Sequence, residues 1–214
     1  MRISSRFAVL RRRAMGRLTA LLIGFGLLGA AAPGFAEPQK YLIDPDHLTV
    51  SFLVTHIGYA KTLGMFRKAS GEFTFDEATG QLSNLRVVVD TDSVFTNHDK
   101  RDEHVRSKDF LNIKEFPEMS FTAARATRTG ERNFEVPGEL TLLGKTKPLT
   151  LTATWNKSDV YAIPTGPLKT KPYVIGVSAR GSLKRSEYGM SYAVANGLVS
   201  DDIELLIELE ASRQ

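Results

Sequence analysis

Histidine is the side chain whose acid–base and metal-binding chemistry is most available near neutral pH, and this sequence has four: His47, His56, His98 and His104. Metal sites usually need closely spaced ligands, such as two histidines one helical turn apart with a carboxylate nearby. His98 and His104 are six residues apart, so they would not share a helical face. His98 and Asp102 could share one, but this spacing favours an ordinary surface helix, and we expect no bound metal.

No nucleophile or phosphate-binding motif is present either. Residues 176–180 (Gly-Val-Ser-Ala-Arg) lack the second glycine of a nucleophile elbow, and they lie inside a strand-like run instead of at a strand-to-helix turn. The sequence contains neither a P-loop nor a dinucleotide fingerprint. We therefore expect no cofactor and no catalytic residues, and the sequence favours a protein that is not an enzyme.

His56 continues an alternating run in which Val50, Phe52 and Val54 share one face. That face should point into the protein, because side chains alternate across a strand. An inward histidine is either a hydrogen-bonded core residue or a polar anchor in a ligand pocket, and the sequence leaves both interpretations open.

Similar alternation recurs along most of the chain and indicates the strands that would position these residues. The alternating runs are 48–56, 71–76, 85–90, 119–123, 134–136, 149–155, 175–184 and 203–209. Turn signals lie at 78–80, 129–130, 137–138, 144–145 and 164–167. This pattern predicts about eight or nine antiparallel strands in a sandwich or barrel. Residues 96–112 break the pattern, because they are charged and lack Gly and Pro. We expect a short helix there, capped by Thr96 or Asn97 and supported by an Asp102–Arg106 pair.

Large and small residues are interleaved on the expected inner face. A barrel of about eight strands is either filled by its side chains or hollow enough for one ligand, and the pattern alone leaves both open. If the barrel is hollow, the candidate ligand-binding residues are Phe52, Val54, His56, Phe66, Phe73, Phe75, Val89, Phe121, Leu151, Trp155, Val177, Ala179 and Gly181.

Residues 1–36 differ in composition from the rest of the chain. They hold six arginines and no acidic residue, with an apolar run at 18–32 and small residues Gly34 and Ala36 at the end. This is the pattern of a secretory signal peptide, and the apolar run is shorter than the roughly 20 residues that span a bilayer. We expect 1–36 to be removed and 37–214 to form one exported domain with no stable membrane span.

The charge balance depends on that segment. The whole chain has 28 basic and 24 acidic residues, but six of the basic residues lie in 1–36, which leaves a net charge of −2 for the remainder. Nucleic-acid-binding domains concentrate positive charge, so we expect no nucleic-acid partner. The sequence has no cysteine, and stability must therefore come from packing without disulfides.

Four spaced motifs carry a family resemblance. The first is Thr96-Asn97-His98, Arg101-Asp102-x-His104-x-Arg106-Ser107-x-Asp109-Phe110-Leu111-Asn112 and Phe116-Pro117. The others are Phe52-x-Val54-x-His56-x-Gly58-Tyr59 with Gly71-x-Phe73-x-Phe75-Asp76, then Gly138-x-Leu140-Thr141-Leu142-x-Gly144-x-Thr146-x-Pro148, and finally Asp202-Ile203. In this order, across nearly all of 37–214, they resemble the YceI-like family of lipid- and polyisoprenoid-binding proteins.

The resemblance implies an all-β, extended lipocalin-like antiparallel barrel of about eight strands with one short helix beside it. It implies that an internal apolar tunnel encloses a long isoprenoid lipid, of polyprenyl or quinone type, and that the protein is a periplasmic carrier. It implies no catalytic set. A homodimer is compatible with the sequence.

Two other functions compete with this interpretation. One is a periplasmic enzyme acting on isoprenoids or quinones, with His56 or the Arg101, Asp102 and His104 group as acid–base residues. The other is an interaction module in which the barrel is only a scaffold.

We predict that the exported protein begins at Glu37, because small residues at 34 and 36 precede a polar start. Amino-terminal sequencing of protein recovered from the periplasm checks this. A start upstream of Leu28 would show that the apolar run is retained as an anchor.

Overall fold

The computed structural model describes residues 37–214, and the expected signal peptide lies outside them, so its removal stays a prediction. The described chain forms twelve strands, one α-helix and three short 3-10 helices. The strands are β1 (Gln39–Ile43), β2 (Thr49–His56), β3 (Ala60–Phe66), β4 (Ala69–Asp76), β5 (Gln81–Asp90), β6 (Val94–Phe95), β7 (Glu118–Ala123), β8 (Thr127–Arg128), β9 (Asn133–Leu142), β10 (Lys145–Val160), β11 (Tyr173–Lys184) and β12 (Val199–Arg213). The helices are η1 (Pro45–His47), η2 (Thr91–Ser93), α1 (Asp99–Arg106) and η3 (Arg185–Tyr188).

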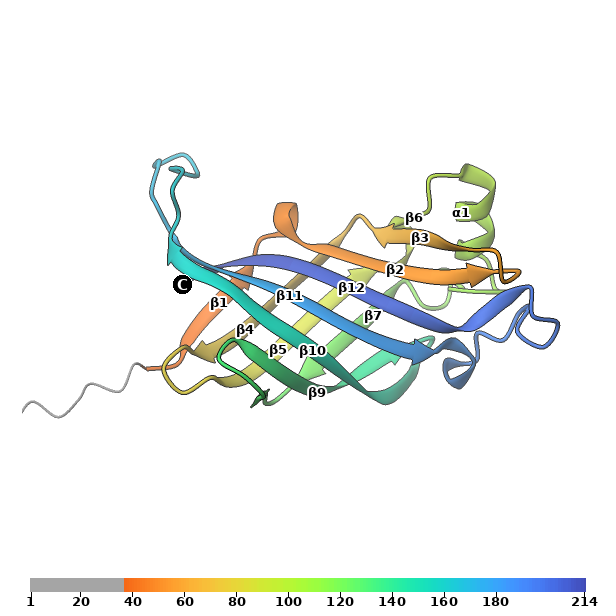
Figure 1. Cartoon of the computed structure of the whole chain (residues 1–214). Coiled ribbons are helices and arrows are strands. Elements are labelled where there is room, and N and C mark those ends of the chain that lie inside the picture. The colour runs from red at the N-terminus through yellow and green to blue at the C-terminus, as the bar shows by residue number, and fades with distance from the viewer. Residues whose placement is uncertain (1–36) are drawn as a thin grey trace, which may run out of the picture. The chain divides into compact units, whose positions relative to one another are not determined.

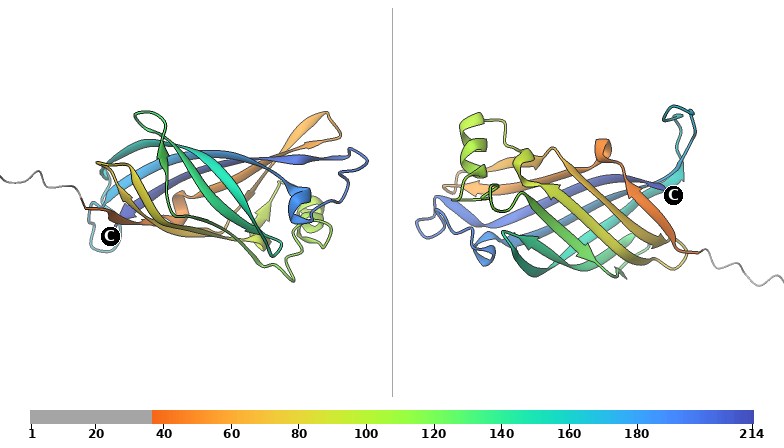
Figure 2. Two further views of the ribbon diagram at one scale, coloured as in Figure 1. Left: turned by 90° about the horizontal axis from the view of Figure 1, so that it is seen from below. Right: turned by 180° about the vertical axis from the view of Figure 1, so that it is seen from behind.

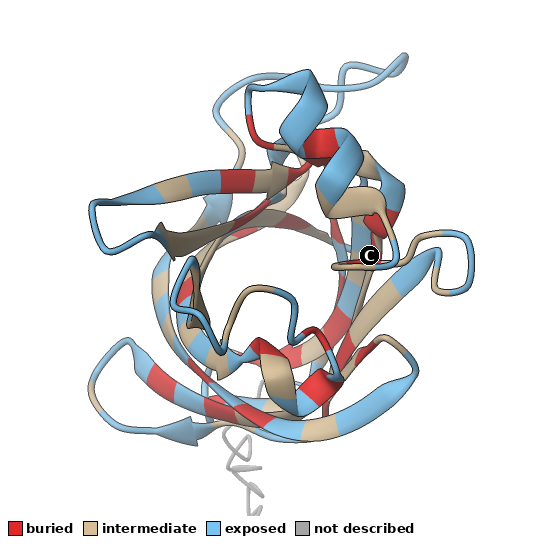
Figure 3. Cartoon of the chain, turned by 90° about the vertical axis from the view of Figure 1, so that its right-hand side faces the viewer, coloured by how far each residue is buried: buried red, intermediate tan, exposed pale blue. Residues whose placement is uncertain are grey.

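Eight antiparallel strands close into a barrel. They follow the order β1-β4-β5-β7-β9-β10-β11-β12, and β12 pairs back onto β1 (Figure 1). Figure 3 looks along the barrel from the end where α1 lies and shows the strands as a ring. The prediction of an all-β antiparallel barrel of about eight strands with one short helix is therefore confirmed.

One edge of β12 pairs with two strands. Its residues 211–213 pair with β1, and its residues 203–208 pair with β2. The 3-10 helix η1 separates β1 from β2, and the Asp44 side chain caps it by accepting the Asp46 N–H at 3.0 Å. From β2 the wall continues through β3 to β6 toward the α1 end (Figure 2).

The alternation predicted for β11 is present in the structure. Ile175, Val177 and Ala179 face the interior, whereas Arg180 lies outside and forms an ion pair with Glu208 of β12. A slip of one residue would bury Arg180 without a partner, so the register of this strand is strongly specified.

The expected turn at 137–138 is wrong, because β9 runs straight through both residues. Pro137 pairs with Thr150 and Gly138 with Leu149 of β10. Gly138 is required for close approach: a Cβ there would overlap the Phe121 ring and the Thr122 carbonyl oxygen.

The helix is shorter than the expected segment 96–112, since α1 spans Asp99–Arg106. Its N-cap is His98, not Thr96 or Asn97, and the His98 Nδ1 accepts the Arg101 N–H at 3.3 Å. Thr96 instead donates its N–H and its hydroxyl to Asp102, at 2.7 and 2.5 Å.

The expected Asp102–Arg106 pair does not form. Asp102 is buried and accepts from Thr96, while Arg106 pairs with Asp92 of η2 at 2.9 Å and donates to the Val94 carbonyl at 2.7 Å. Both side chains therefore fasten α1 to the barrel wall.

We predict that Gly138→Ala destabilises the barrel, because the added methyl group meets a backbone carbonyl as well as the Phe121 ring. Overpacking of this kind costs about 1–3 kcal/mol. Gly176→Ala on β11 is the matched control, since the nearest atom to its Cβ would be the Lys157 carbonyl oxygen at 3.9 Å. Thermal unfolding of both variants checks this, and equal midpoints would contradict it.

Candidate functional site

A cavity of about 270 Å³ lies inside the barrel, with walls contributed by strands β2 to β5, β7 and β9 to β12. Eleven of the thirteen candidate residues line it: Phe52, Val54, Phe66, Phe73, Phe75, Val89, Phe121, Leu151, Trp155, Val177 and Ala179. The barrel is therefore hollow and not filled by its side chains. That these residues contact a ligand stays a prediction.

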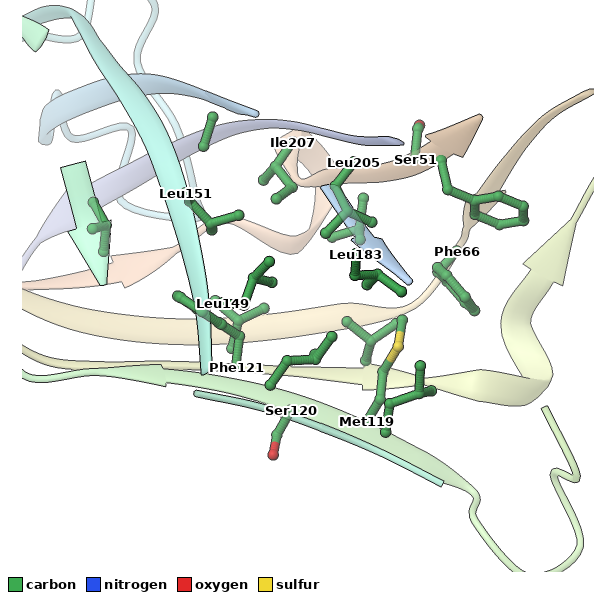
Figure 4. A pocket seen from close by; sticks show the side chains of 18 of the residues that line it. Ser51, Phe66, Met119, Ser120, Phe121, Leu149, Leu151, Leu183, Leu205 and Ile207 are labelled. Atoms are coloured by element: carbon green, nitrogen blue, oxygen red, sulfur yellow. The ribbon is translucent and has the colours of Figure 1, made fainter. Parts of the chain in front are cut away.

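The cavity wall is almost entirely apolar. Its polar members are Ser51, Ser120 and Arg185. Figure 4 shows that the hydroxyl groups of Ser51 and Ser120 turn away from the space enclosed by Leu151, Leu205 and the other apolar side chains. Arg185 is therefore the charged side chain of this wall.

Arg185 is 1% exposed, and its guanidinium donates to four carbonyl oxygens, two in the following loop and two at the start of β12. The acceptors are Ser200 at 2.8 Å, Met190 at 2.9 Å, Tyr192 at 2.8 Å and Val199 at 3.0 Å. Burial lowers the pKa of Arg185, and the nearby Asp201 opposes this effect. An arginine remains protonated in proteins, so one end of the apolar cavity holds a buried positive charge.

The opposite end of the cavity has an aromatic floor. Phe75 contacts Phe134 and Trp155 edge to face, with ring centroids 5.9 and 5.8 Å apart. The Trp155 Nε1 is buried and has no hydrogen-bond partner among the described residues. Beyond this floor Tyr41 is fully buried, and its ring stacks on Phe73 with centroids 5.2 Å apart, so side chains fill the barrel there.

A carboxylate closes that packed end. Glu77 accepts hydrogen bonds from the hydroxyls of Tyr41 at 2.6 Å, Ser158 at 2.6 Å and Tyr173 at 3.0 Å. The Arg213 guanidinium lies 4.5 Å from the centre of the Tyr173 ring. Burial, together with the Glu77 carboxylate, raises the pKa of Tyr41, so its hydroxyl stays protonated and continues to donate.

At the α1 end the cavity is bounded by loops as well as strands. Phe110 lies on the segment after α1, and Met190 and Val199 lie at the two ends of the loop between η3 and β12. The two ends of the cavity thus differ, since one is sealed by hydrogen-bonded side chains and the other is covered by loops.

Two candidate residues do not line the cavity. His56 is exposed at the last position of β2, so the expectation that it points inward is wrong: the strand ends before its side chain can be enclosed. Gly181 pairs with Leu205 of β12, and the Leu151 side chain of β10 occupies the space where a Cβ would be. The small residue here therefore accommodates a neighbour and does not create open space.

The other acid–base candidates also lie outside the cavity wall. Arg101 donates to the Thr96 hydroxyl at 2.7 Å and to the Thr96 carbonyl at 2.6 Å. Arg101 and Asp102 thus both bind Thr96 and fix the backbone that precedes α1. His104 lies 3.1 Å from the Asp109 carboxylate. Across residues 37–214, no three metal-ligating side chains gather at one point; that the protein binds no metal stays a prediction.

Sequence reasoning missed Arg185 and Glu77. Both follow strand ends, at the start of η3 and just after β4, where alternation no longer tells which way a side chain points. The partners of Glu77 are 36, 81 and 96 residues away in the chain, and no local pattern predicts that meeting. For Arg185 the sequence offers a signal only if the period of two is carried past the end of β11, since Arg185 lies two residues after Leu183, which lines the cavity.

Residues 41–211 match the model of the YceI-like domain. The chain belongs to the YceI-like family. A UPF0312 protein of Azotobacter vinelandii is 35% identical over 199 residues, which cover 92% of this chain and 97% of the relative. No helix within residues 37–214 is both long and apolar enough to cross a bilayer.

Two solved structures show the same fold. The YCEI protein of Campylobacter jejuni is 29% identical, with a TM-score of 0.65 over 75% of this chain and 90% of its own. A polyisoprenoid binding domain from Saccharophagus degradans, implicated in plant cell wall breakdown, is 14% identical, with a TM-score of 0.56 over 83% of this chain and all of its own.

We predict that Glu77→Ala lowers the free energy of unfolding by about 1–3 kcal/mol, because it leaves the buried Tyr41 hydroxyl without an acceptor. Glu72→Ala is the control, since Glu72 forms an exposed ion pair with Lys40, worth at most about 1 kcal/mol. Denaturant titration of both variants measures the difference. Equal losses would show that the Glu77 cluster does not hold the barrel end closed.

Proposed function

We propose that this protein is a periplasmic carrier that encloses the chain of a long isoprenoid lipid, of polyprenyl or quinone type, in the cavity of the barrel. The observation that carries the proposal is the cavity wall, which is apolar along its length and charged only at Arg185. Removing apolar surface from water yields about 25 cal/mol per Å², so such a ligand needs few polar contacts.

The two different ends give the ligand a direction. The end closed by Glu77 and the aromatic floor offers no path for a chain, whereas the α1 end is bounded by loops. The apolar chain would therefore enter from the α1 end and reach toward Trp155. Its polar head would remain near Arg185, whose positive charge favours an oxygen-rich head over a cationic one.

Two further observations support this choice of ligand and location. The fold is shared with a polyisoprenoid binding domain of Saccharophagus degradans. The pattern of residues 1–36 is that of a signal peptide, and a net charge of −2 for the remaining chain suits a free periplasmic protein better than one held to an anionic surface.

An enzyme acting on the lipid is less well supported. A general acid or base must come within hydrogen-bond reach of the reacting group. His56, Arg101 and His104 do not line the cavity. A scaffold barrel is also less well supported, because a scaffold gains nothing from an unfilled interior.

We predict that Ala179→Trp abolishes lipid binding and leaves the fold intact. Ala179 lies opposite Ala153 of β10 and lines the cavity, so an indole there would occupy the space for the chain. Ser182→Trp is the matched control, because Ser182 is exposed on the outside of the same strand.

Both variants and the unmodified protein would be incubated with geranylgeraniol, separated from free lipid and extracted for mass spectrometry, with the thermal midpoint measured in parallel. We expect lipid on the unmodified protein and on Ser182→Trp, and none on Ala179→Trp, at similar midpoints. No lipid on the unmodified protein, with a large loss of stability in Ala179→Trp alone, would indicate a solid scaffold barrel.

A further inference from the structure

Four apolar or aromatic side chains project into solvent at the α1 end, and we call them the entrance rim: Ile57, Tyr59, Tyr192 and Leu198. Tyr59, in the turn between β2 and β3, is 90% exposed, and the other three are 43% to 47% exposed. The turn and the 189–198 loop both extend beyond the barrel body at this end (Figure 2). Clustered exposed apolar groups of this kind usually mark an interaction surface.

The two segments that carry the entrance rim are free of charge. Residues 57–60 and 190–199 contain no Asp, Glu, Lys or Arg, in a chain of which 24% is charged. The arm at 161–172, which projects at the opposite end (Figure 1), differs: it exposes Ile163 and Leu168 but also carries Lys169 and Lys171.

The two segments that carry the entrance rim are fixed by contacts. The Ile57 N–H donates to the Leu198 carbonyl at 2.9 Å and so joins the two segments. The Tyr192 ring packs edge to face on His104 and Phe110, with centroids 5.1 and 5.3 Å apart. The exposed apolar surface is thus part of an ordered arrangement.

The entrance rim is continuous with the cavity wall. Val199, which lines the cavity, follows Leu198 directly, and Met190 lies two residues before Tyr192. Phe110 contacts Tyr192 and lines the cavity as well. An apolar path therefore leads from the exposed tips into the barrel.

We propose that the entrance rim inserts shallowly into the surface of a lipid bilayer, so that lipid passes between membrane and barrel without crossing water. The inference rests on the proposed function, because the cargo is a membrane lipid. Tyrosine and aliphatic side chains suit this position, since tyrosine is enriched where an apolar ring meets water at the membrane interface.

The shape and charge of the entrance rim favour a bilayer over a protein partner. A stable protein interface buries about 1,200–2,000 Å², whereas these side chains lie on projecting tips that would touch a flat partner at few points. Among the lysines at this end, Lys61 pairs with Glu204 and Lys184 with Asp202 on the outer wall, and the Lys145 ammonium lies beside Gly189. Because the two segments that carry the entrance rim contain no charged residue, insertion would depend on apolar contact and would not require anionic lipid.

Flotation of the protein with phosphatidylcholine vesicles tests the proposal. The double variant Tyr59→Ser with Leu198→Ser removes apolar groups from the entrance rim, and neither residue lines the cavity. Tyr192 is left unchanged because it packs on α1. Ile163→Ser with Leu168→Ser is the matched control, since it removes exposed apolar groups from the distant arm.

We expect the unmodified protein and the control to float with the vesicles at low and high salt alike, and the rim variant to partition about tenfold less. Equal flotation of the two variants, or release by salt alone, would overturn the proposal. So would self-association of the unmodified protein, seen by light scattering and lost in the rim variant, without flotation.

A second measurement separates this inference from the proposed function. Vesicles containing radiolabelled geranylgeraniol would report how fast lipid reaches the protein and how much remains bound at equilibrium. Docking predicts an uptake rate that rises with vesicle concentration and is slower in the rim variant, with equilibrium binding unchanged. Flotation without any retained geranylgeraniol would contradict the carrier function while leaving docking intact.

Discussion

The closure of β12 onto both β1 and β2 is the constraint on which the rest of the structure depends. Closure joins the first and last strands of the barrel, and it fixes which face of each barrel strand is inside. Residues 203–208 and 211–213 of β12 pair with different strands, so the wall passes from β1 to β2 across η1 and extends toward α1. Within that frame, an alternating sequence places all of its apolar faces around one axis, and the interior becomes a continuous apolar surface.

Neighbouring strands pack tightly against one another in the barrel wall, whereas a cavity separates opposite sides of the wall. Gly64, Gly138 and Gly181 are each covered by a larger side chain of a neighbouring strand, namely Phe52, Phe121 and Leu151. These contacts tighten the wall without reaching the opposite side. The axis is blocked toward the Glu77 end, where hydroxyl donors and an aromatic floor fill the space. A cavity with one sealed end and one loop-covered end suits a ligand with a long apolar chain and a polar head.

The sequence predicted the strands and most of the cavity wall, because both follow from side chains that alternate with a period of two. Sequence-based prediction failed at strand ends and in loops, where alternation does not indicate which way a side chain points. His56 ends a strand and is exposed, and Pro137 and Gly138 look like a turn but lie inside β9. The Glu77 cluster depends on which strands become neighbours, and the buried state of Arg185 depends on a loop that folds over it. Neither arrangement leaves a local signature.

The central claim is that the barrel holds one lipid molecule along its axis. Native mass spectrometry of the protein, purified without detergent from the cells that produce it, measures this most directly. The account predicts a population heavier than the polypeptide by the mass of one lipid, with the polypeptide mass alone after denaturation and an isoprenoid in the organic extract. A single population at the bare polypeptide mass, under conditions that preserve a known lipid carrier with its ligand, would contradict it.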